Sequence, residues 1–346
     1  MHIALISPYS LGTMRGNIST VRRISRFLTM AGVETTVLAS DATSLEEMTA
    51  QLRPLAPTLI HAFHARYTGE ISATLAEHFR IPFIITITGS DLYDPVLRDH
   101  PETVRVLSRA AAITCFSDRD AHELKAHFPD VAGRVTVLSQ GVEILQDDGV
   151  NDFGIPDNAF VLLLPAALRP VKNVEFAISA LSALREKDKK FQLVLAGGDI
   201  DHSYADKIRS TFGTTPWVKW LGEIPHDQMG SLYSRADLVL NCSHYEGMSN
   251  SLMEAMALGK PVVATDISGN RSLLRHGDTG WLFDGDSDFR ALVTMLAADE
   301  ALRREVGSRG RKEIKTNFSP HTEAKMYRNL YRNLCQKMSE GQDSHH

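Results

Sequence analysis

Short runs of apolar and β-branched residues recur along the whole chain, with helical stretches between most of them. In the first half they are 2–8, 34–40, 58–63, 83–89, 111–117 and 134–140, and in the second half 160–168, 191–198, 218–222, 238–243, 261–267 and 279–284. Apolar strands joined by helices are typical of a parallel sheet that is covered on both faces. The sequence therefore predicts an α/β protein with two consecutive doubly wound, Rossmann-like domains, whose ligands bind beyond the carboxyl ends of the strands.

An acidic segment that contains glycine and proline separates the two sets of strands. Its sequence is QDDGVNDFGIPDN, at 146–158, which is typical of a linker between domains. We predict a first domain at 1–148, a linker at 149–158 and a second domain at 159–319. An amphipathic helix is expected at 320–338, followed by a disordered tail at 339–346.

Composition and charge limit the classes of partner. The chain has 346 residues and a formal net charge of -5, which argues against a nucleic acid. No apolar run approaches the roughly 18 residues that span a bilayer, so a cytoplasmic location is expected. A local basic cluster lies on or near the first helix and consists of Arg15, Arg22, Arg23 and Arg26. We interpret it as a solvated helix face, with weak peripheral contact to a membrane surface or an acidic acceptor as the alternative.

The segment 241–266, NCSHYEGMSNSLMEAMALGKPVVATD, contains two acids around the start of an expected helix. Because helical side chains lean toward the N-terminus, Glu254 would point back toward the loop that holds Glu246, and both would border one cavity. The helix start beside Gly247 offers backbone N–H groups and a positive dipole end, which suit a phosphate. Two acids next to an anion site favour a ligand with both hydroxyls and phosphates, such as a sugar nucleotide. The alternative is a solvated helix glutamate and an unrelated loop acid.

The string EGMSNSLMEAMALGKPVVATD closely resembles the donor-binding signature of the retaining glycosyltransferases of family 4. That family has the GT-B fold, in which two Rossmann-like domains face across a cleft and the last helix crosses back to the first domain. The resemblance implies that Glu254 accepts hydrogen bonds from the ribose hydroxyls and Glu246 from hydroxyls of the transferred sugar. It also implies donor contacts at Gly247, Met248, Ser249, Asn250 and Ser251.

The loop after the first strand of the second half carries Arg169 and Lys172 just before an expected helix. Two cations so placed can clamp a diphosphate, although a pair of ordinary surface cations is the alternative. Their position and spacing match the family's Arg and Lys pair, which implies the phosphate role. The resemblance further implies donor contacts at Gly16, in a glycine-containing loop after the first strand, at Gly198, and at Glu223 near the nucleotide base.

The agreement with the family is weaker on the acceptor side. The family commonly has a His-Gly-Ser-Asp string at the end of its fourth strand, whereas this chain has Thr88 in place of the histidine, followed by Ser90 and Asp91. The role of that histidine is therefore in doubt here. Together with GNISTVRR and HAFHAR, the TGSDLY string is similar to the branch of the family that includes selenosugar synthases of selenoneine biosynthesis.

Two histidines at the end of the third strand could supply an imidazole instead. His61 has a structural role as an equal alternative, because a histidine that ends a strand is often simply hydrogen-bonded in place. His64 and Arg66 lie further into the loop and are the better candidates for the acceptor side.

These patterns predict a retaining glycosyltransferase of the hexosyltransferase type, which moves a sugar from a UDP-sugar to a small-molecule or glycan acceptor. The expected catalytic residues are Glu246, Arg169, Lys172 and His64. No metal or cofactor is expected, because cations and helix ends serve the diphosphate and no DxD-type signature accompanies the phosphate loops. A sugar-nucleotide epimerase on the same fold and a non-catalytic sugar-nucleotide-binding protein are the alternatives.

Overall fold

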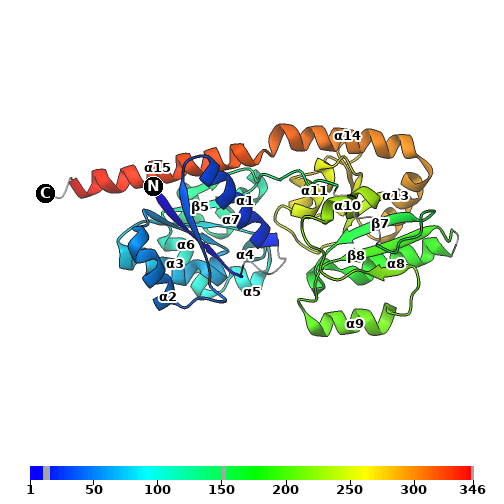
Figure 1. Cartoon of the computed structure of the whole chain (residues 1–346), viewed down its shortest axis with the longest axis horizontal. Coiled ribbons are helices and arrows are strands. Elements are labelled where there is room, and N and C mark those ends of the chain that lie inside the picture. Colours follow the sequence, from blue (N-terminus) through cyan, green and yellow to red (C-terminus); the bar gives the residue numbers. More distant parts are fainter. Residues whose placement is uncertain (11–15, 148, 150–152, 187, 344–346) are drawn as a thin grey trace. The chain divides into compact units, whose positions relative to one another are not determined.

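The computed structural model describes residues 1–10, 16–147, 149, 153–186 and 188–343. The chain divides into two compact units. Unit 1 consists of Met1–Gly141 together with the C-terminal segment from Phe318 onward, and unit 2 is Val142–Asn317. Each unit contains one six-stranded parallel sheet, so the predicted pair of doubly wound domains is confirmed (Figure 1).

The sheet of unit 1 has the strand order β2-β1-β3-β4-β5-β6. Its strands are β1 (His2–Ser7), β2 (Glu34–Ala39), β3 (Leu59–Phe63), β4 (Phe83–Thr86), β5 (Ala112–Cys115) and β6 (Val135–Val137). Its helices are α1 (Gly16–Met30), α2 (Leu45–Leu52), α3 (Ala65–Phe79), α4 (Ser90–Tyr93), α5 (Pro95–Arg98), α6 (Pro101–Arg109), α7 (Asp118–His127) and α15 (Pro320–Asp343), and short 3-10 helices occupy Arg53–Leu55 and Pro129–Arg134. Because β2 and β3 flank β1, the strand order reverses there, which places the ligand-binding edge of this unit after β1 and β3.

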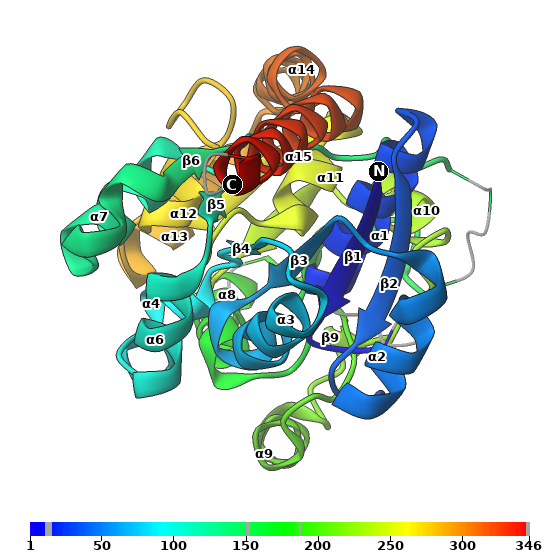
Figure 2. The same cartoon turned by 90° about the vertical axis from the view of Figure 1, so that its left-hand side faces the viewer.

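Successive side chains of the strands pack into two hydrophobic cores, one on each face of this sheet. Ile3 and Leu5 of β1 belong to the core shared with α1 and α15. Ala4 and Ile6 of the same strand belong to the core shared with α2, α3, α6 and α7. Figure 2 shows α15 and α3 on opposite sides of the central strands. Burial on both faces explains why the strands appear in the sequence as unbroken apolar runs.

The C-terminal helix α15 packs on α1, as predicted for a last helix that crosses back to the first domain (Figures 1 and 2). Tyr327 of α15 is fully buried. Arg23 of α1 donates to Glu323 of α15 through Nε (2.9 Å) and Nη2 (3.0 Å), and both side chains are almost inaccessible to solvent. The interpretation of the α1 arginines as one solvated face is therefore wrong for Arg23. It holds for Arg22 and Arg26, which are exposed.

Helix α15 continues to Asp343, beyond the predicted end at 338. The expected disorder of 339–346 is thus not found as far as residue 343, and 344–346 lie outside the described residues. The physical reason is the absence of proline from this segment, so that no residue stops the backbone ladder of a long helix.

The sheet of unit 2 has the order β12-β11-β10-β7-β8-β9. Its strands are β7 (Phe160–Pro165), β8 (Phe191–Ala196), β9 (Val218–Trp220), β10 (Leu238–Asn241), β11 (Val262–Thr265) and β12 (Trp281–Phe283). Its helices are α8 (Val174–Arg185), α9 (His202–Phe212), α10 (Met229–Arg235), α11 (Asn250–Ala257), α12 (Ser268–Arg271), α13 (Asp286–Ala298) and α14 (Glu300–Asn317), with a 3-10 helix at Pro170–Lys172. The order reverses between β7 and β10, so the loops after these two strands border the expected ligand site.

The two units divide at Gly141, before the predicted first-domain end at 148 and the predicted linker at 149–158. The start of the acidic segment packs on α10. A Cβ atom on Gly230 would lie 1.7 Å from the carbonyl oxygen of Gln146, so only glycine permits this approach. The hydroxyl of Ser231 donates to Asp147 (2.5 Å). Specific contacts of this kind explain why these polar residues belong to unit 2, although their composition is that of a linker.

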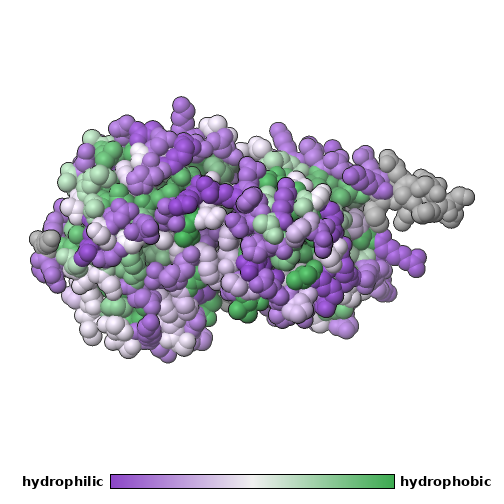
Figure 3. All heavy atoms as spheres, turned by 180° about the vertical axis from the view of Figure 1, so that it is seen from behind, coloured by the Kyte–Doolittle hydropathy of each residue, from purple (hydrophilic) through white to green (hydrophobic). Residues whose placement is uncertain are grey.

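The face of the molecule drawn in Figure 3 is largely polar. Hydrophilic residues cover most of the face drawn in Figure 3, where hydrophobic residues occur in small groups. The most exposed large apolar side chains are Val96 and Met30. In the part of the chain that the structure describes, no helix combines the length and the apolar character needed to cross a membrane.

Candidate active site

The loop after β7 places two cations at the point where the strand order of unit 2 reverses. Arg169 is extended (φ -149°, ψ 149°), Pro170–Lys172 makes one 3-10 turn, and Asn173 adopts a left-handed conformation (φ 49°) before α8 begins. The turn directs Lys172 toward the loop after β10. Arg169 is exposed, and its guanidinium has no hydrogen-bond or ion-pair partner among the described residues.

The loop after β10 holds Glu246 against Lys172. The ammonium of Lys172 contacts Oε1 of Glu246, which also accepts from the hydroxyl of Ser243 (2.7 Å) and from Nδ2 of Asn241 (3.2 Å). The Lys172 and Glu246 side chains are 17% and 15% exposed. Burial raises the pKa of Glu246, but Lys172 and the two hydrogen-bond donors lower it by more, so this pKa lies below the ordinary value. The structure thus brings together Lys172, which is predicted to bind the diphosphate of a donor, and Glu246, which is predicted to bind its sugar.

Asn241, the last residue of β10, organises this loop. Its Oδ1 accepts from the backbone N–H of Ser243 (3.1 Å) and from Nδ2 of Asn270 (3.3 Å), while its Nδ2 also donates to the hydroxyl of Ser249 (3.3 Å). Asn241 is buried and Asn270 is completely so. Neither residue was predicted from the sequence as a site residue. The available signal was a polar amide at the end of an otherwise apolar strand.

Helix α12 supports the same loop from behind. A Cβ atom on Gly269 would lie 2.0 Å from the carbonyl oxygen of Gly247 and 2.3 Å from that of Glu246. No side chain fits there, so the backbone of the acidic loop rests directly on α12. Gly269 was also missed by the sequence analysis.

Helix α11 begins beside Glu246, where an anion-binding helix end was predicted. Ser249 occupies the N-cap position but makes no side-chain cap. Its hydroxyl is engaged with Asn241 and with the hydroxyl of Ser251 (3.1 Å). The preceding Gly247 and Met248 are buried. The first turn therefore has no capping side chain from Ser249 to compete with a ligand for its backbone N–H groups.

The second acid, Glu254, has its own set of partners. Its Oε1 accepts from Nε2 of His226 (2.8 Å) and its Oε2 from the hydroxyl of Tyr233 (2.9 Å). Burial, together with the nearby Glu254, raises the pKa of Tyr233 well above its ordinary value. The hydrogen bond to Glu254 raises the pKa of His226, against the opposing effect of burial. His226 and Tyr233 were not singled out in the sequence, because neither belongs to the acidic motif.

Gly198 and Glu223 meet at the carboxyl end of β8. A Cβ atom on Gly198 would lie 3.3 Å from a carboxylate oxygen of Glu223. The neighbouring Gly197 donates its backbone N–H to the carbonyl of Gly222 (2.8 Å), and a Cβ atom on Gly197 would lie 2.1 Å from the carbonyl oxygen of Ala166. Gly197 is therefore needed for the close approach of the backbone at this edge of the sheet, whereas Gly198 leaves room for the Glu223 side chain.

In unit 1, three predicted acceptor-side residues come together after β3 and β4. Nε2 of His64 lies 2.9 Å from the hydroxyl of Ser90, and Oδ2 of Asp91 lies 4.0 Å from Nδ1. The imidazole stacks on Tyr67, with ring centroids 4.1 Å apart. Burial lowers the pKa of His64, and Asp91 opposes this shift. His64 itself has a positive φ of 83°, which is unusual for a residue with a side chain.

The other two acceptor-side candidates point elsewhere. His61 is completely buried, with Nδ1 2.7 Å from the hydroxyl of Tyr331 and Nε2 2.6 Å from that of Thr86. The expectation that His61 contacts an acceptor is therefore corrected, because both ring nitrogens are engaged inside the core. Arg66 forms an ion pair with Glu102 of α6 (2.5 Å), and its side chain is partly exposed.

Two remaining expectations concern the donor side. Gly16 is the first residue of α1, and residues 11–15 of the loop before it lie outside the described part of the chain. Among the residues that the structure does describe, no group of three or more His, Cys, Asp or Glu side chains is placed to hold a metal ion.

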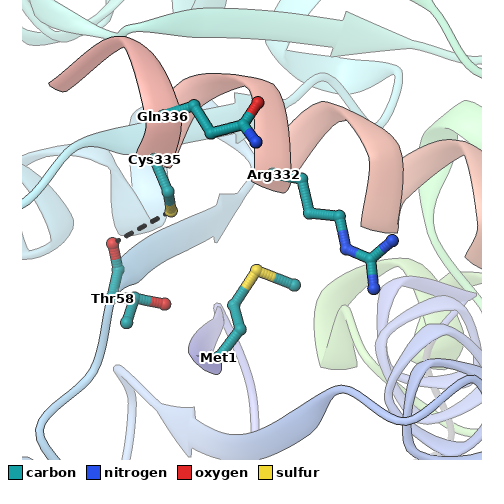
Figure 4. A pocket seen from close by; sticks show the side chains of 5 residues that line it. All are labelled: Met1, Thr58, Arg332, Cys335 and Gln336. Carbon is teal, nitrogen blue, oxygen red and sulfur yellow. Dashed lines mark hydrogen bonds between the residues drawn. The ribbon is translucent and has the colours of Figure 1, made fainter. Parts of the chain in front are cut away.

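Unit 1 also has a pocket of about 290 Å³ at the opposite edge of its sheet. Met1 and Thr58, which precede β1 and β3, line it together with Arg332, Cys335 and Gln336 of α15 (Figure 4). The thiol of Cys335 points to the carbonyl of Thr58 (3.6 Å). Ligands of doubly wound sheets bind beyond the carboxyl ends of the strands, so this amino-terminal pocket is not the predicted site.

The family of glycosyl transferases group 1 matches residues 146–313. This segment of the chain is therefore similar to the group 1 glycosyltransferases. The matched segment contains the Lys172 and Glu246 pair, Glu254 and its two partners, and the Gly198 turn. The matched segment coincides with nearly all of unit 2.

Relatives of known family cover more of the chain. Glycosyltransferase 1 domain-containing protein 1 of Xenopus tropicalis is 26% identical over 336 residues, which cover 92% of this chain and 94% of that protein. D-inositol 3-phosphate glycosyltransferase of Corynebacterium glutamicum (strain R) is 26% identical over 316 residues, covering 83% and 75%. The structure of Anabaena Alr3699/HepE in complex with UDP and glucose has a TM-score of 0.78 at 19% identity, covering 96% of this chain and 100% of that one. These likenesses agree with a GT-B fold built from two Rossmann-like units.

Proposed function

We propose that this group 1 glycosyltransferase transfers a sugar from a UDP-sugar to a nucleophilic acceptor with retention of the anomeric configuration. The observation that carries the proposal is the Lys172–Glu246 ion pair beside the start of α11, at the strand-order reversal of unit 2. One carboxylate and one ammonium in contact offer an acceptor for sugar hydroxyls and a donor for a phosphate within the same few ångströms.

The diphosphate would be bound by fixed cations and backbone amides. Arg169 is exposed and can present its planar fork to two phosphate oxygens. Lys172 has three donor protons, so it can keep its contact with Glu246 while it donates to a phosphate oxygen. The N–H groups at the start of α11 add a third set of donors. Charge that develops on the leaving group is stabilised by these groups, and we propose that transfer needs no metal ion.

The transfer step would exchange two bonds on one face of the sugar. The bond between the anomeric carbon and the diphosphate oxygen breaks, the acceptor nucleophile bonds to the same carbon from the same face, and the nucleophile's proton passes to the departing diphosphate. The other route to retention uses a carboxylate nucleophile. We favour the first route because Oε1 of Glu246 already accepts from Lys172, Ser243 and Asn241, which withdraws charge from the carboxylate and reduces its nucleophilicity.

The classes of donor and acceptor are proposed from the relatives and from short sequence motifs. The structural relative that was solved with UDP and glucose supports a UDP-sugar as donor. A relative that acts on D-inositol 3-phosphate supports a polyol phosphate among the acceptors to be tried. The GNISTVRR, HAFHAR and TGSDLY strings, which are similar to those of the selenosugar synthase branch, add a selenol to this set. The His64–Ser90 pair in unit 1 is the proposed acceptor-side contact.

The test is a screen of nucleotide sugars followed by product analysis. UDP-, GDP-, ADP- and CDP-sugars are added to the protein, and donors that raise its unfolding temperature are carried forward, because binding to the native state stabilises it. Each such donor is then mixed with the protein and with alcohols, thiols or selenols in the presence of a metal chelator. NMR of the product is expected to show the anomeric configuration of the donor, and inversion would contradict the proposal.

The same assay separates the two alternatives. An epimerase changes the sugar of the donor in the absence of any acceptor. A binding protein without catalytic activity raises the unfolding temperature with a donor but releases no nucleoside diphosphate. Transfer to an acceptor is the result that we expect.

A further inference from the structure

Glu254 is held from two sides within unit 2. Nε2 of His226 donates to one carboxylate oxygen (2.8 Å), and the hydroxyl of Tyr233 donates to the other (2.9 Å). Among the described residues, the carboxylate has no further hydrogen-bond partner. Helices α10 and α11, which carry Tyr233 and Glu254, adjoin each other in Figure 1. The carboxylate is therefore fixed by one donor on each oxygen.

The remaining capacity of this carboxylate matches a pair of adjacent hydroxyls. An ionised carboxylate has about four lone-pair sites, and His226 and Tyr233 use one on each oxygen. One acceptor position thus remains on each oxygen. The side chain of Glu254 is 11% exposed, so only a small part of it is accessible to a ligand. The 2′ and 3′ hydroxyls of a ribose are two adjacent donors that could each be accepted by one of these oxygens.

The two donors are placed differently. Tyr233 is completely buried in α10, whereas the side chain of His226 is 39% exposed. His226 lies in the loop that joins β9 to α10. That loop is anchored at its start, where the carbonyl of Gly222 accepts from Gly197 (2.8 Å), and at its end, where the N–H of Met229 donates to the carbonyl of His226 (3.3 Å). His226 is thus the partner of Glu254 that is both fixed by its backbone and open to a ligand.

We propose that His226 is a positioning residue for the nucleotide's ribose. Its Nε2–H sets the rotation of the Glu254 carboxylate, so that the two remaining acceptor positions face the 2′ and 3′ hydroxyls together. This inference rests on the proposed function, because it requires a ribonucleoside diphosphate at the group 1 site. It goes beyond the acidic motif, since His226 comes from another loop. His226 does not contact the ligand's diol itself but orients Glu254, which does.

The experiment compares two nucleotides that differ only in these hydroxyls. Calorimetry measures the binding of UDP and of 2′,3′-dideoxy-UDP to the full chain, with the corresponding pairs of ADP, GDP or CDP used if the wild type binds one of those more tightly. The variants are His226→Ala and His226→Gln. His127→Ala is the control, because the His127 side chain is exposed to a similar degree (35%) and lies beside a glutamate in unit 1.

The expected result is a loss that depends on the hydroxyls. His226→Ala lowers the affinity for UDP by about tenfold, which is typical of a lost hydrogen bond to a charged group, and leaves the affinity for the dideoxy analogue within about twofold. His226→Gln, whose amide nitrogen can replace Nε2, recovers most of the loss. His127→Ala changes neither affinity.

Four outcomes would overturn the inference. An equal loss for both nucleotides in His226→Ala would show that the histidine only supports its loop, and an unchanged affinity for UDP would show that it does not orient the carboxylate. If Glu254→Gln lowers the affinity for both nucleotides equally, or for neither, while the wild type binds UDP, the ribose assignment fails and the transferase proposal stands. If the wild type binds none of the four ribonucleoside diphosphates, both fail.

Discussion

Arg23 of α1 and Glu323 of α15 lie 300 residues apart in the sequence and form a buried ion pair through two hydrogen bonds. The side chain of Arg23 is 5% exposed and that of Glu323 is 0% exposed. Gly141 allows this arrangement, because a Cβ atom there would lie 2.5 Å from the backbone of Pro320. The pair therefore joins the last helix to the first one inside unit 1.

Removal of one partner of this pair is expected to release α15. In Glu323→Gln the guanidinium of Arg23 loses its counter-charge in a buried position, which costs about 3–5 kcal/mol. Hydrogen exchange by mass spectrometry is expected to show faster exchange of the α15 amides. The double variant Arg23→Met with Glu323→Met restores slow exchange, because an apolar pair leaves no buried charge. The exposed pair Arg304–Glu300 is the control, where Glu300→Gln is expected to cost under about 1 kcal/mol.

Replacement of Glu246 and replacement of Glu254 are expected to impair different steps of the reaction. Glu246→Gln lowers turnover by on the order of 100-fold and leaves the binding of free UDP nearly intact, because Glu246 is proposed to contact only the transferred sugar. Glu254→Gln weakens the binding of UDP itself by about tenfold. Calorimetry with UDP and initial rates with the donor measure the two effects. The opposite pattern would overturn the assignment of the acids.

Removal of the Lys172 ammonium is expected to shift the low-pH decline of turnover to higher pH. Lys172 and two hydrogen-bond donors hold the pKa of Glu246 below its ordinary value, so the carboxylate stays ionised as the pH falls toward that value. In Lys172→Met the pKa of Glu246 rises, because burial then acts with less opposition. The residual turnover of the variant is expected to decline at higher pH than that of the wild type. Lys207→Met, which breaks an exposed pair with Glu175, is expected to leave the profile unchanged.

Most of the fold followed from local sequence patterns, whereas the links within the site did not. All twelve predicted strands occur, because parallel strands buried on both faces leave an apolar signature in the sequence. The pairing of Lys172 with Glu246 depends on β7 and β10 being neighbours in the sheet. Strand order is set by how helices pack, and a linear pattern does not contain it. The same limit applies to His226 and Glu254, which come from separate loops.

The fate of His61 shows a second limit. A histidine at the carboxyl end of a strand can face a ligand or the core, and the sequence treats the two cases alike. The structure places His61 among Phe63, Tyr327 and Tyr331, because α15 covers this face of the sheet. A segment from the far end of the chain therefore decides the role of a residue near its start.

Burial of His61 is expected to make unit 1 sensitive to acid. Desolvation lowers the pKa of His61 to about 3, whereas the unfolded chain has an ordinary value near 6.5. Between these values the unfolded state binds more protons, so the stabilising contribution is fully present above about pH 6.5 and is lost as the pH falls toward 3. From about pH 7 to about pH 5 the wild type is expected to lose about 2 kcal/mol that His61→Gln retains. Hydrogen exchange of unit 1 amides measures this difference, and parallel losses in the two proteins would contradict it. His78→Gln, at an exposed position, is the control.

The close contact between α12 and the loop that holds Glu246 allows a test of the site in which no residue proposed to contact a ligand is changed. A methyl group on Gly269 would lie 2.0 Å from the carbonyl oxygen of Gly247 and 2.3 Å from that of Glu246, distances that force the backbone of the loop to move. Gly269→Ala is therefore expected to lower kcat by at least tenfold through displacement of Glu246, since small errors in position cost large factors in rate. It is also expected to cost about 1–3 kcal/mol of stability, as overpacking does. Gly133→Ala, where a methyl group meets nothing within 4 Å, is the control and is expected to change neither quantity. Full activity of Gly269→Ala would show that the position of the Glu246 loop does not limit transfer.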